Sequence, residues 1–231
     1  MERIKTGVEG LDYLLEGGFP HPSSVLITGP PGSGKTILGL QFLYEGASKY
    51  KEPGLLINME GFPNEISWYA EVFDWDLGAL QQKGLLIFSS YDPAEFEKFE
   101  LRTLHSEIII QLQRVIKQIK AKRVVIDSIT PLGQALKDKA KFRTLLYYLS
   151  KALKENGCTS LFIAEKVDEK DTEFQVESFL MDGVIELNFT ARADVLENTL
   201  MIKKMVATKF PRSKYLIDFS EKGIRLATGY Y

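Results

Sequence analysis

The stretch Ile27–Thr36, ITGPPGSGKT, decides how the first part of the chain folds. From Gly29 to Thr36 it fits the pattern G-x-x-x-x-G-K-[ST] in full. The run before it, Ser24 to Thr28, suits a buried strand, and Thr36 to Tyr50 suits a helix. A glycine-rich turn between a strand and a helix is the context that this pattern requires, so we expect a phosphate-binding loop.

The chemistry of such a loop follows from its residue types. Glycines let successive backbone N–H groups curl around phosphate oxygens, and the positive end of the following helix dipole faces the same anion. We expect Lys35 to reach the terminal phosphates and the Thr36 hydroxyl to hold Mg²⁺. The alternative, a Gly/Pro-rich turn with Thr36 as a helix cap, does not require a Lys-Thr pair at this spacing. The residues expected to bind the nucleotide are Gly29, Gly32, Ser33, Gly34, Lys35 and Thr36.

Two carboxylates follow later apolar runs. Asp127 ends "VVID" within Arg123 to Ser128, a run that suits a strand covered on both faces, and it is the candidate second ligand of the hydrated metal. Its alternative role is to cap a turn before Pro131. Glu60 follows Leu55 to Met59 and is the candidate base or water-orienting group for hydrolysis. Its alternative is a solvated carboxylate at a strand end.

The rest of the chain alternates short apolar runs with segments of helical period, which is typical of an α/β fold with a mostly parallel twisted sheet flanked by helices. The expected strands are Ser24 to Thr28, Leu55 to Met59, Leu85 to Ser89, Arg123 to Ser128 and Thr159 to Ala164. The expected helices are Thr36 to Tyr50, a segment beginning at Pro63, an amphipathic segment from Leu101 to Ile119, and Phe142 to Glu155. From Gly183 onward, short runs linked by turns indicate strands that extend the sheet in antiparallel fashion. Glu16 to Pro22 and Lys209 to Ser213 read as loops.

Composition sets outer limits on the function. The chain has 231 residues, 45% of them apolar, which fits a single domain over residues 1–231. With 29 basic and 31 acidic residues the net charge is −2, so no global positive field attracts nucleic acid or anionic lipid. No stretch has the length of a membrane span, and we expect a cytoplasmic protein without a membrane partner. The lone Cys158 is expected to be a buried structural residue.

Four segments together resemble one protein family. They are "TGVEGLDYLLEGGFPHPSSVLITGPPGSGKT" (Thr6–Thr36), "LLINMEGFPNEI" (Leu55–Ile66), "AKRVVIDSITPL" (Ala121–Leu132) and "FLMDGVIELN" (Phe179–Asn188). With them the chain resembles the RecA superfamily, specifically the single-domain KaiC-like ATPases that archaea carry beside their RadA recombinases. The resemblance covers nearly the whole chain.

This resemblance implies a RecA-like core that binds ATP and Mg²⁺ at the interface between protomers, and a homo-oligomer, either a ring or a filament, as the working form. It assigns water-mediated metal binding to Asp127 and the catalytic carboxylate to Glu60. It places Glu165 where relatives have a polar residue that senses the γ-phosphate, and Lys204 where a lysine reaches into a neighbour's active site.

The sequence also departs from the family pattern. Glu60 is followed by Gly61, where relatives commonly have a second glutamate. The family's approximate Lys-Met-Arg-Gly-Thr is replaced by a segment, Lys204 to Thr208, that lacks the arginine. An arginine that stabilises the transition state contributes several kcal/mol, and a nearby lysine does not reproduce its bidentate geometry. We therefore expect slow hydrolysis.

Two functions remain open from the sequence. The first is an ATPase that couples nucleotide state to assembly or to a recombination, repair or signalling partner. The second is a nucleotide-dependent regulatory or scaffold module with vestigial hydrolysis. The acidic segment Lys166 to Glu177 disfavours contact with DNA phosphates, whereas Pro131 to Lys141, read as a solvated loop with three lysines, leaves weak DNA binding open. A self-phosphorylation region like that of the relatives is not recognisable around Thr208.

Overall fold

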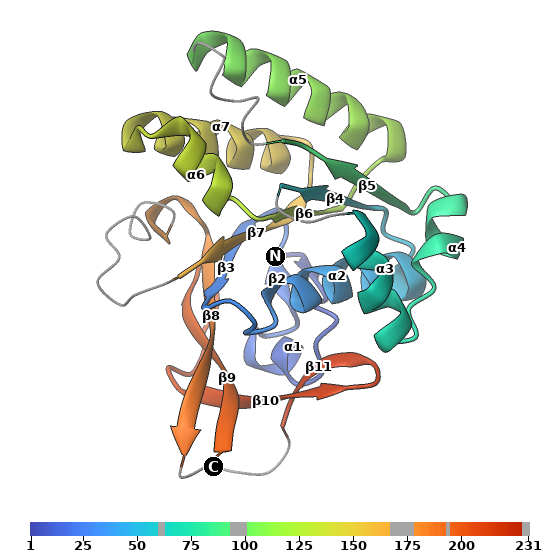
Figure 1. Cartoon of the computed structure of the whole chain (residues 1–231), viewed down its shortest axis with the longest axis vertical. Coiled ribbons are helices and arrows are strands. Elements are labelled where there is room, and N and C mark those ends of the chain that lie inside the picture. Colours follow the sequence, from blue (N-terminus) through green and yellow to red (C-terminus); the bar gives the residue numbers. More distant parts are fainter. Residues whose placement is uncertain (60–62, 93–100, 167–177, 193–194, 228–231) are drawn as a thin grey trace.

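A nine-stranded sheet organises the computed structural model, which describes residues 1–59, 63–92, 101–166, 178–192 and 195–227 (Figure 1). The strand order is β11-β10-β9-β8-β3-β7-β6-β4-β5. The bounds are β3 Ser24–Gly29, β4 Gly54–Asn58, β5 Leu86–Ser90, β6 Arg123–Asp127, β7 Thr159–Glu165, β8 Gly183–Arg192, β9 Val195–Met205, β10 Lys214–Ser220 and β11 Gly223–Leu226. The expected α/β fold is confirmed.

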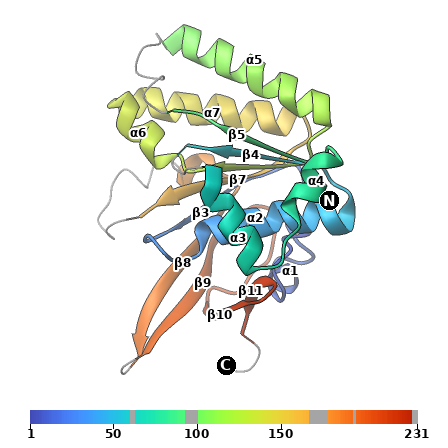
Figure 2. The ribbon, with the colours of Figure 1, turned by 45° about the vertical axis from the view of Figure 1, so that its right-hand side comes forward.

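Helices cover both faces of the sheet (Figure 2). Their bounds are α1 Leu11–Leu14, α2 Lys35–Glu45 continued by a π-helical turn over Gly46–Tyr50, α3 Pro63–Val72, α4 Leu77–Gln82, α5 Leu101–Ile119, α6 Thr130–Leu136 and α7 Lys139–Glu155. In β3, Val25 and Ile27 face the layer that contains α2, while Leu26 faces the layer of α5 and α7. All six residues of β3 are buried, because neighbouring strands and both helical layers enclose it. No helix in the part of the chain that the structure describes is long and apolar enough to cross a membrane.

The strand pairing differs from expectation at β8. Strands β3, β7, β6, β4 and β5 are parallel, and β8 is also parallel to β3 on one side while pairing antiparallel with β9 on the other. The antiparallel extension therefore begins one strand later than predicted. The reason is the long connection after β7, since a parallel neighbour requires a crossover of a dozen residues or more.

Most of the segment Pro131 to Lys141 is helical, so its interpretation as a loop was wrong. Thr130–Leu136 forms α6, with Pro131 in its first turn, where a missing N–H costs no helical hydrogen bond. Asp138 then caps α7 by accepting hydrogen bonds from the N–H groups of Ala140 (2.9 Å) and Lys141 (3.1 Å). This cap begins α7 at Lys139 rather than at Phe142.

The predicted loop Glu16 to Pro22 also contains a short strand, β2. It spans Phe19–Pro20 and pairs antiparallel with β1, which spans Arg3–Ile4. Phe19 is fully buried. Because β2 is too short to show any periodicity in the sequence, its formation depends on contacts with residues that are distant in sequence.

A register shift in β9 lies at two consecutive lysines, of which one is left without a partner residue on β8. Ile185 lies opposite Ile202, and Val184 lies opposite Lys204, so Lys203 is the extra residue of a bulge. The ammonium group of Lys203 lies 2.8 Å from a carboxylate oxygen of Glu186. Glu186 and Val184 lie on the same face of β8. The side chains of Lys203 and Lys204 therefore both lie on this face of the sheet.

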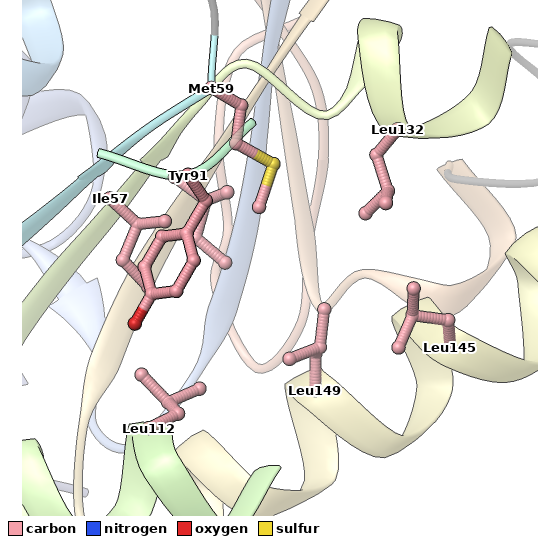
Figure 3. Close-up of a pocket in the computed structure, with 8 residues that line it drawn as sticks. Ile57, Met59, Tyr91, Leu112, Leu132, Leu145 and Leu149 are labelled. Carbon is pink, nitrogen blue, oxygen red and sulfur yellow. The ribbon is translucent and has the colours of Figure 1, made fainter. Parts of the chain in front are cut away.

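A small apolar cavity of about 20 Å³ lies between the sheet and helices α5 and α7 (Figure 3). Its lining residues are Ile57, Met59, Tyr91, Leu112, Ile126, Leu132, Leu145 and Leu149. A void of this size is close to that of a single water molecule, and apolar walls offer water few hydrogen bonds. It is therefore a packing defect rather than a ligand site.

Candidate nucleotide-binding site

The loop between β3 and α2 is built around glycines that cannot carry a side chain. Gly34 has φ of 94°, and an added Cβ would lie 2.8 Å from the ring of Phe219. At Gly29 an added Cβ would overlap the carbonyl oxygen of Leu187. Gly34 has no side chain that could cap α2. The first N–H groups of this 11-residue helix, which have no acceptor within the helix, are therefore available to a ligand in the loop. This geometry favours an anion at the helix start.

The two residues after Gly34 carry the polar groups of the loop. Lys35 is buried, and its Nζ donates a hydrogen bond to the carbonyl oxygen of Pro30 (2.9 Å). The hydroxyl of Ser33 is buried close to Gly29, and it has no hydrogen-bond partner among the described residues. Burial without a partner is costly for a hydroxyl, so a polar ligand in the loop would stabilise this arrangement.

A cavity of about 160 Å³ opens beside this loop. Its walls come from the loop and α2, from α3, and from the ends of β6 and β7. The lining residues are Pro31, Gly32, Gly34, Lys35, Thr36, Ile37, Tyr69, Asp127, Ser128, Ile163 and Glu165. The cavity is therefore lined by basic, acidic and hydroxyl groups together with apolar side chains.

Parallel pairing brings the two carboxylates to the loop. Asp127 ends β6 and Glu165 ends β7, and Glu165 lies in register with Gly29 at the end of β3. The backbone N–H of Glu165 donates to the Thr130 hydroxyl (2.9 Å), and the N–H of Lys166 donates to the Gly29 carbonyl (3.0 Å). The peptide bond after Asp127 is cis. Three strand ends thus share one rim with the glycine loop.

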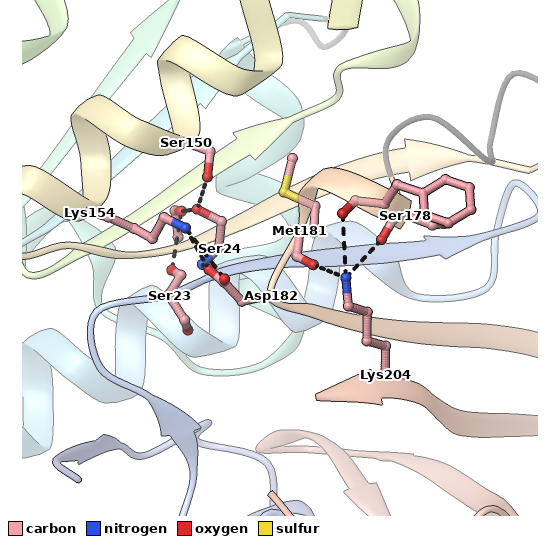
Figure 4. Close-up of polar contacts among 10 residues, drawn as sticks. Ser23, Ser24, Ser150, Lys154, Ser178, Met181, Asp182 and Lys204 are labelled. Carbon is pink, nitrogen blue, oxygen red and sulfur yellow. Dashed lines mark hydrogen bonds and ion pairs between the residues drawn. The ribbon is translucent and has the colours of Figure 1, made fainter. Parts of the chain in front are cut away.

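Two further residues expected at the site lie elsewhere or outside the described residues. Glu60 falls outside them, although Met59 donates its N–H to the carbonyl oxygen of Asp127 (2.7 Å) at the same rim. Lys204 does not line the cavity. Its Nζ donates to the carbonyl oxygens of Met181 (2.6 Å), Ser178 (3.3 Å) and Phe179 (3.5 Å) of the same chain (Figure 4).

Asp182 joins this carbonyl cluster to the beginning of β3. Its carboxylate accepts a hydrogen bond from the Ser24 N–H (2.9 Å) and pairs with Lys154 of α7 (3.1 Å) (Figure 4). The Ser24 hydroxyl also accepts a hydrogen bond from Ser150 (2.8 Å) and contacts the Ser160 hydroxyl (3.0 Å). The strand that ends in the glycine loop is therefore anchored at its other end by polar contacts.

Sequence reasoning did not single out Tyr69 and Ile37 as residues of this cavity. Ile37 follows the motif directly, and its proximity was available from its position alone. Tyr69 lies on α3, and no pattern in that helix distinguishes it from its neighbours. Only the packing of α3 beside the loop brings its side chain to the cavity.

A buried carboxylate lies on the strand beside β3. Glu186 is in register with Thr28, and its side chain pairs with Lys166 (2.7 Å) and Lys203 (2.8 Å). Burial raises the pKa of this carboxyl, but the hydrogen bonds from both lysines outweigh burial, and the pKa is lowered from its ordinary value. Glu186 is therefore ionised at neutral pH and links the first residue after β7 to β9.

Comparison with known proteins agrees with this arrangement. The model of the KaiC ATPase family matches residues 4–229. A UPF0273 protein of Thermotoga maritima is 33% identical, over 97% of this chain and 95% of its own length. A UPF0273 protein of Pyrococcus horikoshii is also 33% identical, over 96% of this chain and 92% of its own length.

A clock protein and a solved structure extend the comparison. The circadian clock oscillator protein KaiC of Parathermosynechococcus lividus is 34% identical over 96% of this chain, which spans 42% of that relative. The crystal structure of a KaiC-like protein from Pyrococcus horikoshii superposes with a TM-score of 0.86 at 31% identity, covering 98% of this chain and 99% of that one. Both the sequence and the fold thus show that this chain belongs to the KaiC-like ATPases of the RecA superfamily.

Proposed function

We propose that this chain binds Mg-ATP in the cavity beside the glycine loop and hydrolyses it slowly at an interface between protomers. One observation carries the proposal. The cavity joins Lys35 and Thr36 of the loop to Asp127 and Glu165, which come from two other strand ends far along the chain. Membership in a family of nucleotide-binding ATPases supports the same function.

The loop would bind the triphosphate through its backbone and one ammonium group. The N–H groups of Gly29 to Gly34 and the start of α2 present donors and a positive dipole end to the phosphates. Lys35 would exchange its hydrogen bond with Pro30 for the terminal phosphates. The buried Ser33 hydroxyl would gain a partner on binding.

The donor set fits a magnesium ion that is completed by the nucleotide. Thr36 supplies a hydroxyl and Asp127 a carboxylate on the same cavity, and both are hard oxygen donors. No group of three or more His, Cys, Asp or Glu side chains suited to a metal is found in the described ranges. Mg²⁺ commonly binds through one or two protein oxygens together with phosphates and water, so a richer protein cage is not required.

Hydrolysis would use Glu60 to orient and deprotonate a water molecule at the γ-phosphate, with Glu165 placed to sense that phosphate. Asn58, two residues before Glu60, lies in register with Asp127, which supports a position at the same rim. The absence of the family's arginine at Val206 supports a slow rate, since transition-state charge would lack one stabilising group.

We further propose that the nucleotide state controls a homo-oligomer, a ring or a filament, in which Lys204 approaches the nucleotide of a neighbour. In the isolated chain Lys204 is held by three carbonyl oxygens. Assembly would have to offer the ammonium group better partners, and a neighbour's phosphates are such partners. Through this assembly the chain would act on a recombination, repair or signalling partner.

The alternative is a regulatory or scaffold module in which ATP occupancy sets assembly and hydrolysis is vestigial. Two observations favour this alternative. Lys204 is held by hydrogen bonds to carbonyl oxygens of its own chain, and position 206 is a valine. It shares the binding site with the first proposal and differs only in turnover.

Two measurements on the full chain separate these functions. Titration calorimetry with ATP and Mg²⁺ measures binding, and steady-state phosphate release measures turnover. Both proposals require that Lys35→Ala weaken ATP binding by a factor of about ten or more, the loss of a charged hydrogen bond. An ATPase requires that wild type release phosphate above background and that Glu60→Gln remove this activity. Equal background rates in wild type and Glu60→Gln would instead support the regulatory module. Unchanged ATP binding in Lys35→Ala would refute both.

A further inference from the structure

The basic residues of this chain are concentrated in one part of the fold. Residues 109–155 contain eleven Lys and Arg but only three Asp and Glu, although the whole chain has a net charge of −2. The remaining residues therefore have ten more acidic than basic side chains. Arg123, which is buried, and Asp127, at the nucleotide cavity, belong to this segment, and leaving both out does not change the balance.

Part of this positive charge lies on the exposed sides of two adjacent helices, α5 and α7. Helices α5 and α7 pack side by side over one face of the sheet, and both views show them as its outermost layer (Figures 1 and 2). Their sheet-facing side chains, such as Leu112 and Leu149, are buried, while the opposite sides are exposed. We define the basic face by six exposed residues: Arg114, Lys117, Arg143, Tyr147, Tyr148 and Lys151.

Aromatic rings lie between the charges. On α7, Arg143, Tyr147 and Lys151 follow at intervals of four residues, so they form one stripe along the helix. Tyr147 is 50% exposed and Tyr148 is 41% exposed, and their rings meet edge to face at 5.3 Å. Lys151 has an exposed partner in Glu155 at 3.8 Å, a pair of little strength in water.

This combination is suited to a polyanion that also carries flat aromatic groups. Clustered lysines and arginines bind phosphates by releasing counterions, and exposed tyrosine rings offer surfaces on which bases stack. A membrane surface would require a broad set of apolar side chains that insert between lipids, whereas the large apolar side chains exposed on the described parts of α5 and α7 are Ile110 and the two tyrosines. The charge balance and the rings therefore favour a single-stranded nucleic acid.

We propose that the basic face binds single-stranded nucleic acid, with Arg143 and Lys151 on phosphates and Tyr147 stacked on a base. The face lies on the side of the sheet opposite α2, so the strand and the nucleotide in the cavity would be bound at separate places. The proposal stands independently of ATP hydrolysis, because it rests on α5 and α7 alone.

The test is fluorescence anisotropy of labelled single-stranded DNA and RNA oligonucleotides of mixed sequence, titrated with the full chain with and without ATP. Wild type should bind one or both, with affinity falling as salt rises. Arg143→Glu/Lys151→Glu should lower the affinity at least about 100-fold and reduce the slope of log K against log salt by about 1.4, for two lost phosphate contacts. Tyr147→Ala should lower the affinity about tenfold without changing this slope.

The matched control is Lys83→Glu/Lys222→Glu, which changes the net charge equally at two exposed lysines outside the basic face. It should retain affinity within a factor of about three, because its charges lie away from the proposed contact surface. Circular dichroism and thermal unfolding check that each variant is folded. If the charge reversals prevent folding, Arg143→Gln/Lys151→Gln removes the same contacts with less repulsion.

Four outcomes would overturn the proposal. The first is the absence of salt-dependent binding to either oligonucleotide, and the second is an equal loss of affinity in the control variant. The third is binding to anionic lipid vesicles but not to oligonucleotides, which would assign the face to a membrane surface. The fourth is self-association that only the Arg143/Lys151 variant loses, together with no oligonucleotide binding, which would assign it to a second copy of the chain.

Discussion

Arg123, the first residue of β6, donates a hydrogen bond from Nη1 to the carbonyl oxygen of Phe42 in α2 (2.8 Å), which ties the strand of one candidate metal ligand to the helix that follows the glycine loop. The same nitrogen donates to the carbonyl oxygen of Lys5 (2.9 Å), and the guanidinium group pairs with Glu52. Arg123 is fully buried, and its guanidinium carbon lies 4.5 Å from the centre of the Phe42 ring. The contact therefore joins three segments of the chain in the interior.

We predict that Arg123→Met lowers the free energy of unfolding by about 3–5 kcal/mol, because buried carbonyl groups and Glu52 lose their partner. Chemical denaturation with both fluorescence and circular dichroism measures the change. Arg225→Met is the control, since Arg225 pairs with Asp218 at 3.7 Å and both side chains are about half exposed. It should change the free energy by less than about 1 kcal/mol. Similar losses in both variants would show that Arg123 has no special structural role.

A glycine pair tests whether the loop geometry matters for the ligand. Gly34 and Gly157 both have positive φ, 94° and 69°, so alanine costs about 1 kcal/mol of backbone strain at either position. Only Gly34 is crowded, by the ring of Phe219, whereas nothing lies within 4 Å of a Cβ at Gly157. We predict that Gly34→Ala weakens ATP binding at least about tenfold, while Gly157→Ala leaves it unchanged. Calorimetric titration of both variants gives the comparison, and equal affinities would contradict it.

The ion pairs of Glu186 predict how the free energy of unfolding depends on pH. Its pKa in the folded chain is lowered from 4.5, so its ion pairs with Lys166 and Lys203 stabilise the fold above this pH. This stabilisation is lost as pH falls through the lower folded value. Glu186→Gln should therefore be less stable than wild type at neutral pH, and the difference should shrink on acidification. Denaturation curves between about pH 7 and pH 3 measure it; a difference that is constant with pH would argue against the ion pairs.

Cys158 should be chemically inert in the folded chain. It is fully buried, its Sγ lies 3.3 Å from the carbonyl oxygen of Ala121, and burial raises the pKa of the thiol to about 11. Only the thiolate reacts quickly with disulfide reagents. We predict no reaction with a coloured aromatic disulfide at neutral pH in buffer, and stoichiometric reaction in denaturant. Rapid labelling of the native chain would show that this core opens readily.

The parts of the fold that the sequence predicted well are those decided by local pattern. The strand before the glycine loop, the run that ends at Asp127 and the amphipathic helix Leu101–Ile119 all agree with their expected type. Each has a clear period or an uninterrupted apolar run, and the bounds are within one or two residues. The burial of Cys158 was also confirmed.

What failed depended on contacts between distant residues. Helix α6 was missed because Pro131 and Gly133 are residue types typical of loops. The short helix is stabilised by Leu132, which lies in the core. The parallel side of β8 was missed because one strand with two kinds of neighbour has no distinctive local pattern. In the candidate site, the glycine loop and the strand-end carboxylates were predicted as members of one site, but Tyr69 depends on how α3 packs and had no signal in the sequence.

The bulge in β9 has a consequence for any experiment on its lysines. Regular alternation would direct consecutive side chains to opposite faces of the sheet, whereas the extra residue lets Lys203 reach Glu186 while Lys204 holds the carbonyl oxygens of the segment before β8. On that side Lys203 is paired with a carboxylate, whereas Lys204 is held by uncharged carbonyl oxygens. A Lys204→Ala substitution would therefore remove the donor of these carbonyl oxygens and leave the ion pair of Lys203 in place.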